Sequence, residues 1–324
     1  MYKAVISGIG SYVPEQRLSN RDLEQMVDTS DEWIITRTGI SERRIAASWQ
    51  ATSDLAFQAA AAALKDANLS PEDIDLLVVA TVTPDHIFPS VACQLQHRLG
   101  CRNVGAFDVG ATCVGFISAL NIAEQFLKNG RHQHILVVGA DTLSRITDYT
   151  DRSTCILFAD GAGAWVVSRS EISDEKGIIH SSIHSAGEHF ERLYVPEGGS
   201  RHPAGKETKA KIVMEGNKIF KLAVNAMSQT VQETMETTGY TAEDIDWLIP
   251  HQANQRILEA VAKNLDFDQE KVINTIKYYG NNSSATIPLA MDTAVKDGRI
   301  RRGDTIMLTA FGGGLVWGSL LFEY

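Results

Sequence analysis

The chain has 324 residues, of which 44% are apolar and 22% are charged, and its formal net charge at pH 7 is −10. This length is sufficient for a large hydrophobic core divided between two packed units. The acidic balance argues against a nucleic-acid-binding protein, because the sequence contains no basic segment extensive enough to cover phosphates.

The first ten residues, MYKAVISGIG, run directly into a strand-like segment and contain no long apolar core of a signal peptide. No stretch reaches the roughly 18 consecutive apolar residues that a membrane-spanning helix requires. We therefore expect a cytoplasmic protein without a membrane partner. The four cysteines are irregularly spaced and form no C-x-x-C pair, which predicts neither a metal site nor a disulfide framework.

Two motifs occur twice in the same order. The residues EDID begin at Glu72 and again at Glu243, and a K-x-G-R motif begins at Lys128 and again at Lys296. Each motif is followed by an apolar strand-like run. The repetition predicts a duplicated α/β unit, with one half over residues 1–172 and the other over residues 173–324.

Each half has the same predicted order of elements: an apolar strand, a helix, a segment of small residues, a second helix and another strand. The continuous Val/Ile/Leu runs predict sheets that are covered on both faces. The predicted strands span residues 76–82, 134–140, 247–251 and 305–311. The predicted helices include residues 52–70, 113–130 and 253–265. The polar, Gly-rich segment 187–211 predicts a long surface loop or flap.

The segment DVGATCVGF places Cys113 between small residues at the start of the predicted helix 113–130. Unpaired N–H groups and the positive end of the helix dipole favour an anion there, which predicts a lowered pKa and a nucleophilic thiolate. The backbone N–H of Cys113 would also point toward an oxyanion formed during attack on a carbonyl. Taken alone, a small residue required for close strand–helix packing explains Cys113 equally well.

The duplication relates Cys113 to a second residue. Cys113 lies 17 residues before Gly130, and Asn281 lies 17 residues before Gly298. We therefore expect Cys113 and Asn281 to occupy equivalent positions in the two halves, each opening a helix. An ordinary N-cap is the alternative interpretation of Asn281.

His251 closes the apolar strand of the second half, and the counterpart of that strand ends near Ala80. The junction of the two halves is predicted to bring Cys113, His251 and Asn281 together. A buried core histidine is the alternative interpretation of His251. The Gly-rich run FGGGLVWG near the C-terminus allows a close backbone approach and could supply a second oxyanion donor.

At these residues the chain resembles the β-ketoacyl-acyl-carrier-protein synthase III family of the thiolase superfamily. The resemblance runs through VDTSDEWIITRTGISERRIA, FPSVACQLQ, DVGATCVGF, DRSTCILFADGAGA, IPHQAN, YGNNSSATIP and AFGGGLVWGS, and so covers nearly the whole chain. It implies the thiolase fold, which is α/β with duplicated halves in a five-layered α-β-α-β-α arrangement, and a homodimer.

The resemblance implies the initiating condensing enzyme of type II fatty acid synthesis. Such an enzyme joins an acyl primer from acyl-CoA, here expected to be short, to malonyl-acyl-carrier protein by decarboxylative Claisen condensation. The products are 3-oxoacyl-acyl-carrier protein, coenzyme A and carbon dioxide. No metal and no cofactor beyond the coenzyme A thioester substrate are implied.

The resemblance also assigns roles in the reaction. Cys113 would carry the acyl primer as a thioester, and His251 and Asn281 would donate hydrogen bonds to the thioester carbonyl of malonyl-acyl-carrier protein. The backbone N–H groups of Cys113 and Gly313 would form the oxyanion hole.

Further residues match the family's binding positions. Trp33 resembles the tryptophan that stacks on adenine, with Arg152 on its other face and Arg37 near the coenzyme A phosphates. Asn254 matches a polar residue of the pantetheine channel. Phe88 matches a phenylalanine that reaches across the dimer and closes the partner's primer pocket.

A basic patch would receive the acidic carrier protein. Arg256 and Lys263 are seven residues apart on one predicted helix and therefore share a face. Lys221 matches another docking position of the family. Ordinary solvated charges remain the alternative interpretation, above all for Lys263.

The chain departs from the family's usual motifs at Thr112 and Val114 beside the nucleophile and at Asn282 and Ser284 after Asn281. These changes leave the choice of primer open. They do not put the class of reaction in doubt. The alternative function is a related Cys-His-Asn starter ketosynthase or acyltransferase of a polyketide or secondary-metabolite pathway, which would have the same three residues.

Two other functional classes fit the sequence less well. A dinucleotide-binding module is indicated only weakly by SGIGSY, because the third glycine of G-x-G-x-x-G is missing. A noncatalytic scaffold would leave the combination of Cys113, His251 and Asn281 unexplained.

Overall fold

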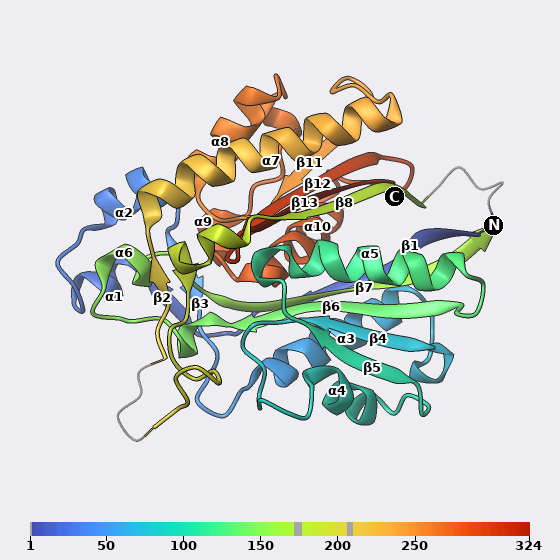
Figure 1. The fold of residues 1–324 in the computed structure, drawn as a ribbon, viewed down its shortest axis with the longest axis horizontal. Coiled ribbons are helices and arrows are strands. Elements are labelled where there is room, and N and C mark those ends of the chain that lie inside the picture. Colours follow the sequence, from blue (N-terminus) through green and yellow to red (C-terminus); the bar gives the residue numbers. More distant parts are fainter. Residues whose placement is uncertain (1, 172–176, 206–209) are drawn as a thin grey trace.

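The computed structural model describes residues 2–171, 177–205 and 210–324, and its long strands form two mixed sheets (Figure 1). The first sheet has the order β1 (Tyr2–Tyr12), β7 (Asp160–Glu171), β6 (His134–Thr142), β4 (Leu76–Ala80) and β5 (Gly105–Val109). The second sheet has the order β11 (Trp247–Pro250), β12 (Thr305–Gly312), β13 (Val316–Glu323) and β8 (Gly177–Ser185). The predicted boundary between residues 172 and 173 lies outside the described residues.

The pairing of the strands is the same in both sheets. The β4–β6 and β11–β12 pairs are parallel, whereas the β6–β7 and β12–β13 pairs are antiparallel. The outer strands β1 and β8 pair antiparallel with β7 and β13. The second sheet therefore repeats four strands of the first, in the same relative directions.

Three layers of helices enclose these sheets (Figure 1). The outer face of the first sheet is covered by α3 (Thr52–Asp66) and α4 (Val91–Leu99). Between the sheets lie α5 (Gly115–Lys128) and α10 (Thr286–Lys296), and the outer face of the second sheet is covered by α7 (Gly216–Thr238) and α8 (Gln255–Asn264). This confirms the predicted five-layered α-β-α-β-α arrangement.

Short elements surround one end of these layers. They are β2 (Arg17–Ser19), α1 (Asn20–Glu24), α2 (Asp31–Thr38), β3 (Glu42–Arg44), α6 (Arg152–Cys155), β9 (Leu193–Tyr194), β10 (Val213–Met214) and α9 (Ile276–Tyr279). The predicted loop 187–211 contains a short 3-10 turn, η4 (Gly187–Arg192), and β9. Residues 206–209 of that loop lie outside the described part of the chain.

The central helix α5 is apolar on most of its circumference because it packs against a sheet on each side. Phe116, Ile117 and Leu120 are completely buried in the cluster that joins both sheets. The ring of Phe116 meets that of Trp165 edge-on, with 5.0 Å between centroids. A core of this kind holds the first turn of α5, next to Cys113, in a fixed position.

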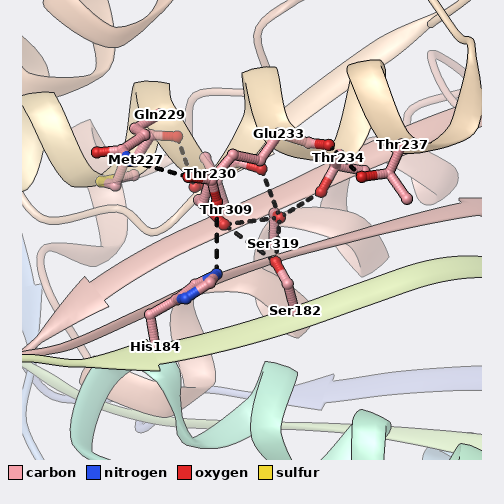
Figure 2. A network of polar contacts seen from close by, with 10 residues as sticks. All are labelled: Ser182, His184, Met227, Gln229, Thr230, Glu233, Thr234, Thr237, Thr309 and Ser319. Atoms are coloured by element: carbon pink, nitrogen blue, oxygen red, sulfur yellow. Dashed lines mark hydrogen bonds and ion pairs between the residues drawn. The ribbon is translucent and has the colours of Figure 1, made fainter.

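The long helix α7 contacts the second sheet partly through hydroxyl groups (Figure 2). The hydroxyls of Thr230 and Thr234 lie 3.0 and 2.7 Å from that of Ser319 on β13, and Ser182 on β8 joins the same cluster at 3.1 Å. These small side chains bring the helix close to the sheet while their buried polar atoms remain hydrogen-bonded.

The repeat is clearest where equivalent elements begin. Residues 76 and 247 open β4 and β11, residues 134 and 305 open β6 and β12, and residues 115 and 286 open α5 and α10. Each pair is separated by the same interval, 171 positions. The helix α10 has 11 residues where α5 has 14, so counting back from the helix ends misaligns the two helix starts.

The predicted equivalence of Cys113 and Asn281 is therefore wrong. Cys113 lies within a 3-10 turn, η2 (Thr112–Val114), directly before α5, and the corresponding turn before α10 is η6 (Ser283–Ala285). The residue equivalent to Cys113 is Ser284. Asn281 precedes η6 and lies in neither α5 nor α10.

Candidate active site

Cys113 is held in the turn η2 between the end of β5 and the start of α5. Thr112 before it has a positive φ of 47°, which is rare for a threonine and is typical of strained functional sites. The hydroxyl of Thr112 donates to the carbonyl of Gly313, with 3.0 Å between the oxygens. This hydrogen bond connects the turn η2, which contains Cys113, to the Gly-rich segment that follows β12.

The thiol of Cys113 is not activated in the way the sequence predicts. Burial raises the pKa of Cys113 to about 12; the hydroxyl of Ser283 opposes this shift and the charge of Asp141 adds to it. A helix start contributes about 0.3–1 kcal/mol at an exposed site and up to about 2 kcal/mol at a partly buried one, which is too little to offset the burial of a thiolate. The predicted lowering of the pKa is therefore wrong, and Cys113 is a neutral thiol at physiological pH.

A cavity of about 260 Å³ opens at Cys113. Its lining includes Thr112, Cys113, Ser283 and Gly313. The other lining residues are mainly apolar: Val82, Leu143, Ile146, Phe158, Leu193, Tyr194, Val195 and Ile212. A thiol that lines an apolar cavity can receive an acyl chain that lies away from water.

Glycine is required where the end of β12 passes Cys113. A Cβ on Gly312 would lie 2.9 Å from the backbone nitrogen and 3.2 Å from the Cβ of Cys113. A Cβ on Gly313 would lie 2.6 Å from the carbonyl oxygen of Leu193. Only residues without a side chain bring this backbone so close to Cys113 and to the cavity.

His251 follows β11 and is almost completely buried, with 1% of its surface exposed. Its backbone N–H donates to the carbonyl of Thr309, and Nδ1 of its ring lies 2.6 Å from the hydroxyl oxygen of Thr286. Burial lowers the pKa of His251 to about 3. The imidazole is therefore neutral at physiological pH and can donate one hydrogen bond from its ring.

Asn281 is fixed by its backbone and by its side chain. Its backbone N–H donates to Leu157 O and its carbonyl accepts from Ala159 N, at 2.9 and 2.8 Å. Its Oδ1 accepts from the backbone N–H of Ser283 at 2.9 Å. The backbone N–H of Ser283 can donate only to the oxygen of the Asn281 amide, which fixes the orientation of that amide. The Nδ2 group of Asn281 therefore points away from Ser283 and is available as a hydrogen-bond donor.

The turn η6 connects these two residues to the cavity. Ser283 lines the cavity together with Cys113 and donates its backbone N–H to Asn281, and its carbonyl oxygen lies 3.0 Å from the hydroxyl oxygen of Thr286. Thr286 in turn contacts His251. Ser283 has a positive φ of 50°, like Thr112 in η2. Sequence reasoning did not identify Ser283 or Thr286, because only the folded turn gives them this position.

The structure also brings together the four residues predicted for coenzyme A. The guanidinium carbons of Arg152 and Arg37 lie 4.8 and 5.7 Å from the ring centroid of Trp33. Asn254 donates through Nδ2 to the carbonyl of Arg37 at 3.0 Å, and its Oδ1 caps α8. Cationic groups around an indole suit a nucleotide with phosphates.

The predicted docking residues lie on the outer helices. Lys221 is exposed on α7, and Arg256 and Lys263 are exposed on α8. The guanidinium carbon of Arg256 is 5.4 Å from the ring centroid of Phe220, the neighbour of Lys221. Arg256 therefore extends toward α7, whereas Lys263 lies in the last turn of α8.

Phe88 does not line the cavity of its own chain. It is 83% exposed in the segment between β4 and α4, and its neighbour Ile87 is 90% exposed. The predicted contact of Phe88 with a partner's primer pocket stays a prediction.

Within the described ranges, no three His, Cys, Asp or Glu side chains are placed to hold a metal ion. In the same part of the chain, no helix combines the length and the apolar character that crossing a membrane requires.

Comparison with known proteins agrees with this geometry. The family model "3-Oxoacyl-(acyl-carrier-protein (ACP)) synthase III" matches residues 107–187, and its C-terminal counterpart matches residues 235–324. The β-ketoacyl-(acyl-carrier-protein) synthase III of Thiobacillus denitrificans is 54% identical over 320 residues, which are 98% of each chain. The corresponding protein of Xanthomonas oryzae is 51% identical over the same share of both chains.

Solved structures extend the similarity to the fold. The 3-oxoacyl-(acyl-carrier-protein) synthase III of Aquifex aeolicus superimposes with a TM-score of 0.93 at 46% identity, covering 99% of this chain and 100% of the other. The priming β-ketosynthase of the R1128 polyketide pathway superimposes with a TM-score of 0.94 at 33% identity, covering 99% and 96%.

Proposed function

The chain belongs to the 3-oxoacyl-acyl-carrier-protein synthase III family, and we propose that Cys113, His251 and Asn281 carry out the family's condensation in it. The protein is an acyltransferase that initiates fatty acid synthesis. In the proposed reaction it joins an acyl group from acyl-CoA to malonyl-acyl-carrier protein, and coenzyme A and carbon dioxide leave.

In the first half-reaction, the sulfur of Cys113 attacks the thioester carbonyl of acyl-CoA. The new S–C bond replaces the bond to coenzyme A, and the thiol proton of Cys113 passes to the departing sulfur. The oxyanion of the tetrahedral intermediate would accept hydrogen bonds from the backbone N–H groups of Cys113 and Gly313. The proposal is supported above all by one observation: Cys113 and Gly313 line the same mainly apolar cavity.

In the second half-reaction, malonyl-acyl-carrier protein replaces coenzyme A. Its carboxylate leaves as carbon dioxide, and the electron pair of the broken bond forms an enolate whose charge rests on the thioester oxygen. Neutral His251 and the Nδ2 group of Asn281 would donate to this oxygen as the charge develops. The enolate carbon then attacks the acyl carbonyl, and Cys113 leaves as a thiolate that takes up a proton.

The proposal also includes the residues that would bind coenzyme A and the carrier protein. Trp33, Arg37 and Arg152 would hold the nucleotide of coenzyme A, and Asn254 would border the path of its pantetheine arm. Support comes from the clustering of both guanidinium groups on Trp33 and from the tether between Asn254 and Arg37. Lys221, Arg256 and Lys263 would contact the acidic carrier protein, supported by their exposure on α7 and α8.

We also propose a homodimer in which Phe88 closes the primer cavity of the partner subunit. Two large apolar side chains, Ile87 and Phe88, are adjacent and almost fully exposed, which is costly unless another surface covers them. An aromatic ring at the end of the cavity would limit the primer to short chains.

Two variants test whether His251 and Asn281 act in the second half-reaction and not in the acylation of Cys113. His251→Ala and Asn281→Ala should still become acylated at Cys113, because η2 and the run after β12 remain. Each should lose malonyl decarboxylation by roughly 10²–10³-fold, the loss that is typical of one oxyanion donor. Release of carbon dioxide and the mass of the acyl-enzyme report the two steps separately. Equal loss of both steps would contradict the proposal and would indicate that these residues activate the thiol.

A further inference from the structure

A neutral histidine acts as a donor or as an acceptor according to which ring nitrogen carries its single proton. Burial lowers the pKa of His251 to about 3, so its ring carries only one N–H in the working range of pH. Since Nδ1 faces Thr286, Nε2 is the nitrogen left for the substrate. Stabilisation of an enolate requires the proton on Nε2, because an unprotonated Nε2 would present a lone pair to a negative oxygen.

The hydroxyl of Thr286 is the only side-chain partner of this ring in the part of the chain that the structure describes. Its oxygen lies 2.6 Å from Nδ1 of His251 and 3.0 Å from the carbonyl oxygen of Ser283. A hydroxyl has one hydrogen and can donate to only one of these acceptors at a time. The direction of that single hydrogen bond therefore determines the tautomer of His251.

The two distances favour donation to the ring. Hydrogen bonds from N–H to oxygen usually span about 2.7–3.2 Å, and those from O–H to oxygen span about 2.5–3.0 Å. The 2.6 Å contact between Thr286 and Nδ1 is shorter than the usual N–H···O bond, and the 3.0 Å contact to Ser283 lies at the long limit for a bond from O–H to oxygen. The carbonyl of Ser283 also accepts the backbone N–H of Thr286, so it has a partner without the hydroxyl.

We propose that Thr286 is a positioning residue, whose hydroxyl donates to Nδ1 of His251 and so keeps the proton of the ring on Nε2. Asn281 provides a parallel: the backbone N–H of Ser283 fixes its amide oxygen and leaves Nδ2 as a donor. The turn η6 and the residue after it would thus orient both donors of the condensation step. This inference rests on the proposed role of His251 in that step.

Nitrogen-15 NMR of histidine-labelled protein tests the tautomer without substrate or turnover. The His251 signals are assigned by their disappearance in His251→Gln. The expected result is a protonated Nε2 in the native enzyme and in Thr286→Ser, which retains the hydroxyl. In Thr286→Val, which keeps the shape of the side chain but not the hydroxyl, the proton should move wholly or partly to Nδ1.

The same variants should separate the half-reactions. Thr286→Val should lower malonyl decarboxylation on the order of 10²-fold and leave acylation of Cys113 nearly unchanged, and Thr286→Ser should restore decarboxylation. Thr234→Val removes an equally buried hydroxyl in the α7 cluster (Figure 2) and should change neither step.

Two results would overturn the inference. One is a proton on Nδ1 of His251 in the native enzyme, which decides the matter even if Thr286→Val does not fold. The other is an Nε2 proton that persists in Thr286→Val. Neither result depends on activity, so the inference can fail while the proposed function holds.

Discussion

The hydroxyl of Ser284 lies 2.8 Å from a carboxylate oxygen of Asp141, and both residues are buried. Ser284 occupies the position in the second half that Cys113 occupies in the first, while Asp141 lies next to the end of β6 in the first half. The carboxylate also accepts from the backbone N–H of Val82, which borders the cavity at Cys113, at 2.8 Å. One buried carboxylate thereby joins the turn after Asn281 to the cavity wall.

Loss of this junction should lower stability in a graded way. Ser284→Ala removes one hydrogen bond to a charged group and should reduce the free energy of unfolding by about 1.5–3 kcal/mol. Asp141→Asn should reduce the free energy of unfolding by more than Ser284→Ala does. The asparagine amide would point its N–H groups at hydrogen-bond donors that now face the carboxylate. Urea unfolding measures both changes.

Ser228→Ala is the matched control, since the buried hydroxyl of Ser228 has no hydrogen-bond partner among the described residues. An equal loss of stability in Ser284→Ala and Ser228→Ala would contradict the assignment of the Ser284–Asp141 pair.

The buried neutral His251 should make stability depend on pH. Its pKa is about 3 in the fold and 6.5 in the unfolded chain. The unfolded chain therefore takes up a proton first as the pH falls, and the contribution of His251 is lost between pH 6.5 and 3. From pH 7 to 5 this loss amounts to about 2 kcal/mol. Urea unfolding measures the decrease in the free energy of unfolding from pH 7 to pH 5. In His251→Gln this decrease should be smaller than in the native protein by about 2 kcal/mol. Equal decreases in the two proteins would contradict the buried neutral state of His251.

Part of the architecture follows from the sequence, because the duplicated motifs and apolar runs place the strands β4, β6, β11 and β12 and the helices α3, α5 and α8 in order. His251 and Cys113 lie where their motifs predict them. The equivalence of Cys113 and Asn281 fails because α10 is shorter than α5. The sequence predicts the wrong direction for the pKa of Cys113, because burial depends on residues distant in sequence, such as Leu193 and Ile212 in the lining of the same cavity.

Thr286 and Asp141 could not be identified from the sequence for a related reason. A threonine or an aspartate at the end of an element usually serves as a cap or a solvated group. Their importance comes from partners far along the chain, such as His251 for Thr286 and Ser284 for Asp141. Only packing of the two halves brings these groups together.

Removal of the aromatic or cationic part of the proposed coenzyme A site should weaken substrate binding. Trp33→Ala should raise KM for acetyl-CoA about tenfold or more, and Arg152→Ala should raise it about 2–5-fold, as expected for loss of a cation–π contact worth about 0.5–1 kcal/mol. The kcat of acylation should change little. Trp49→Ala is the control, because Trp49 is 75% exposed and has no cation–π contact with Arg37 or Arg152 in the part of the chain that the structure describes. A similar rise of KM in Trp49→Ala would speak against the assigned site.

The proposed role of Phe88 predicts the length of the primer. The native enzyme should accept acetyl-CoA or another short acyl-CoA and reject octanoyl-CoA, because a rigid ring at the end of a cavity excludes longer chains by collision. Phe88→Ala should extend the range, whereas Ile87→Ala, its exposed neighbour, should not. Acylation rates with a series of acyl-CoA esters measure the profile. Efficient use of octanoyl-CoA by the native enzyme, or an unchanged profile in Phe88→Ala, would show that another surface limits the chain.

The most direct test of the central claim is the intact mass of the protein after exposure to acetyl-CoA. The native enzyme should gain the mass of one acetyl group, mapped by proteolysis to Cys113, and Cys113→Ala should gain none. Cys101 and Cys155 are buried away from the cavity lining, and Cys93 is exposed on α4, so all three should stay unmodified. An adduct that persists in Cys113→Ala, or that maps to one of the other cysteines, would contradict the assignment of Cys113 as the acyl carrier.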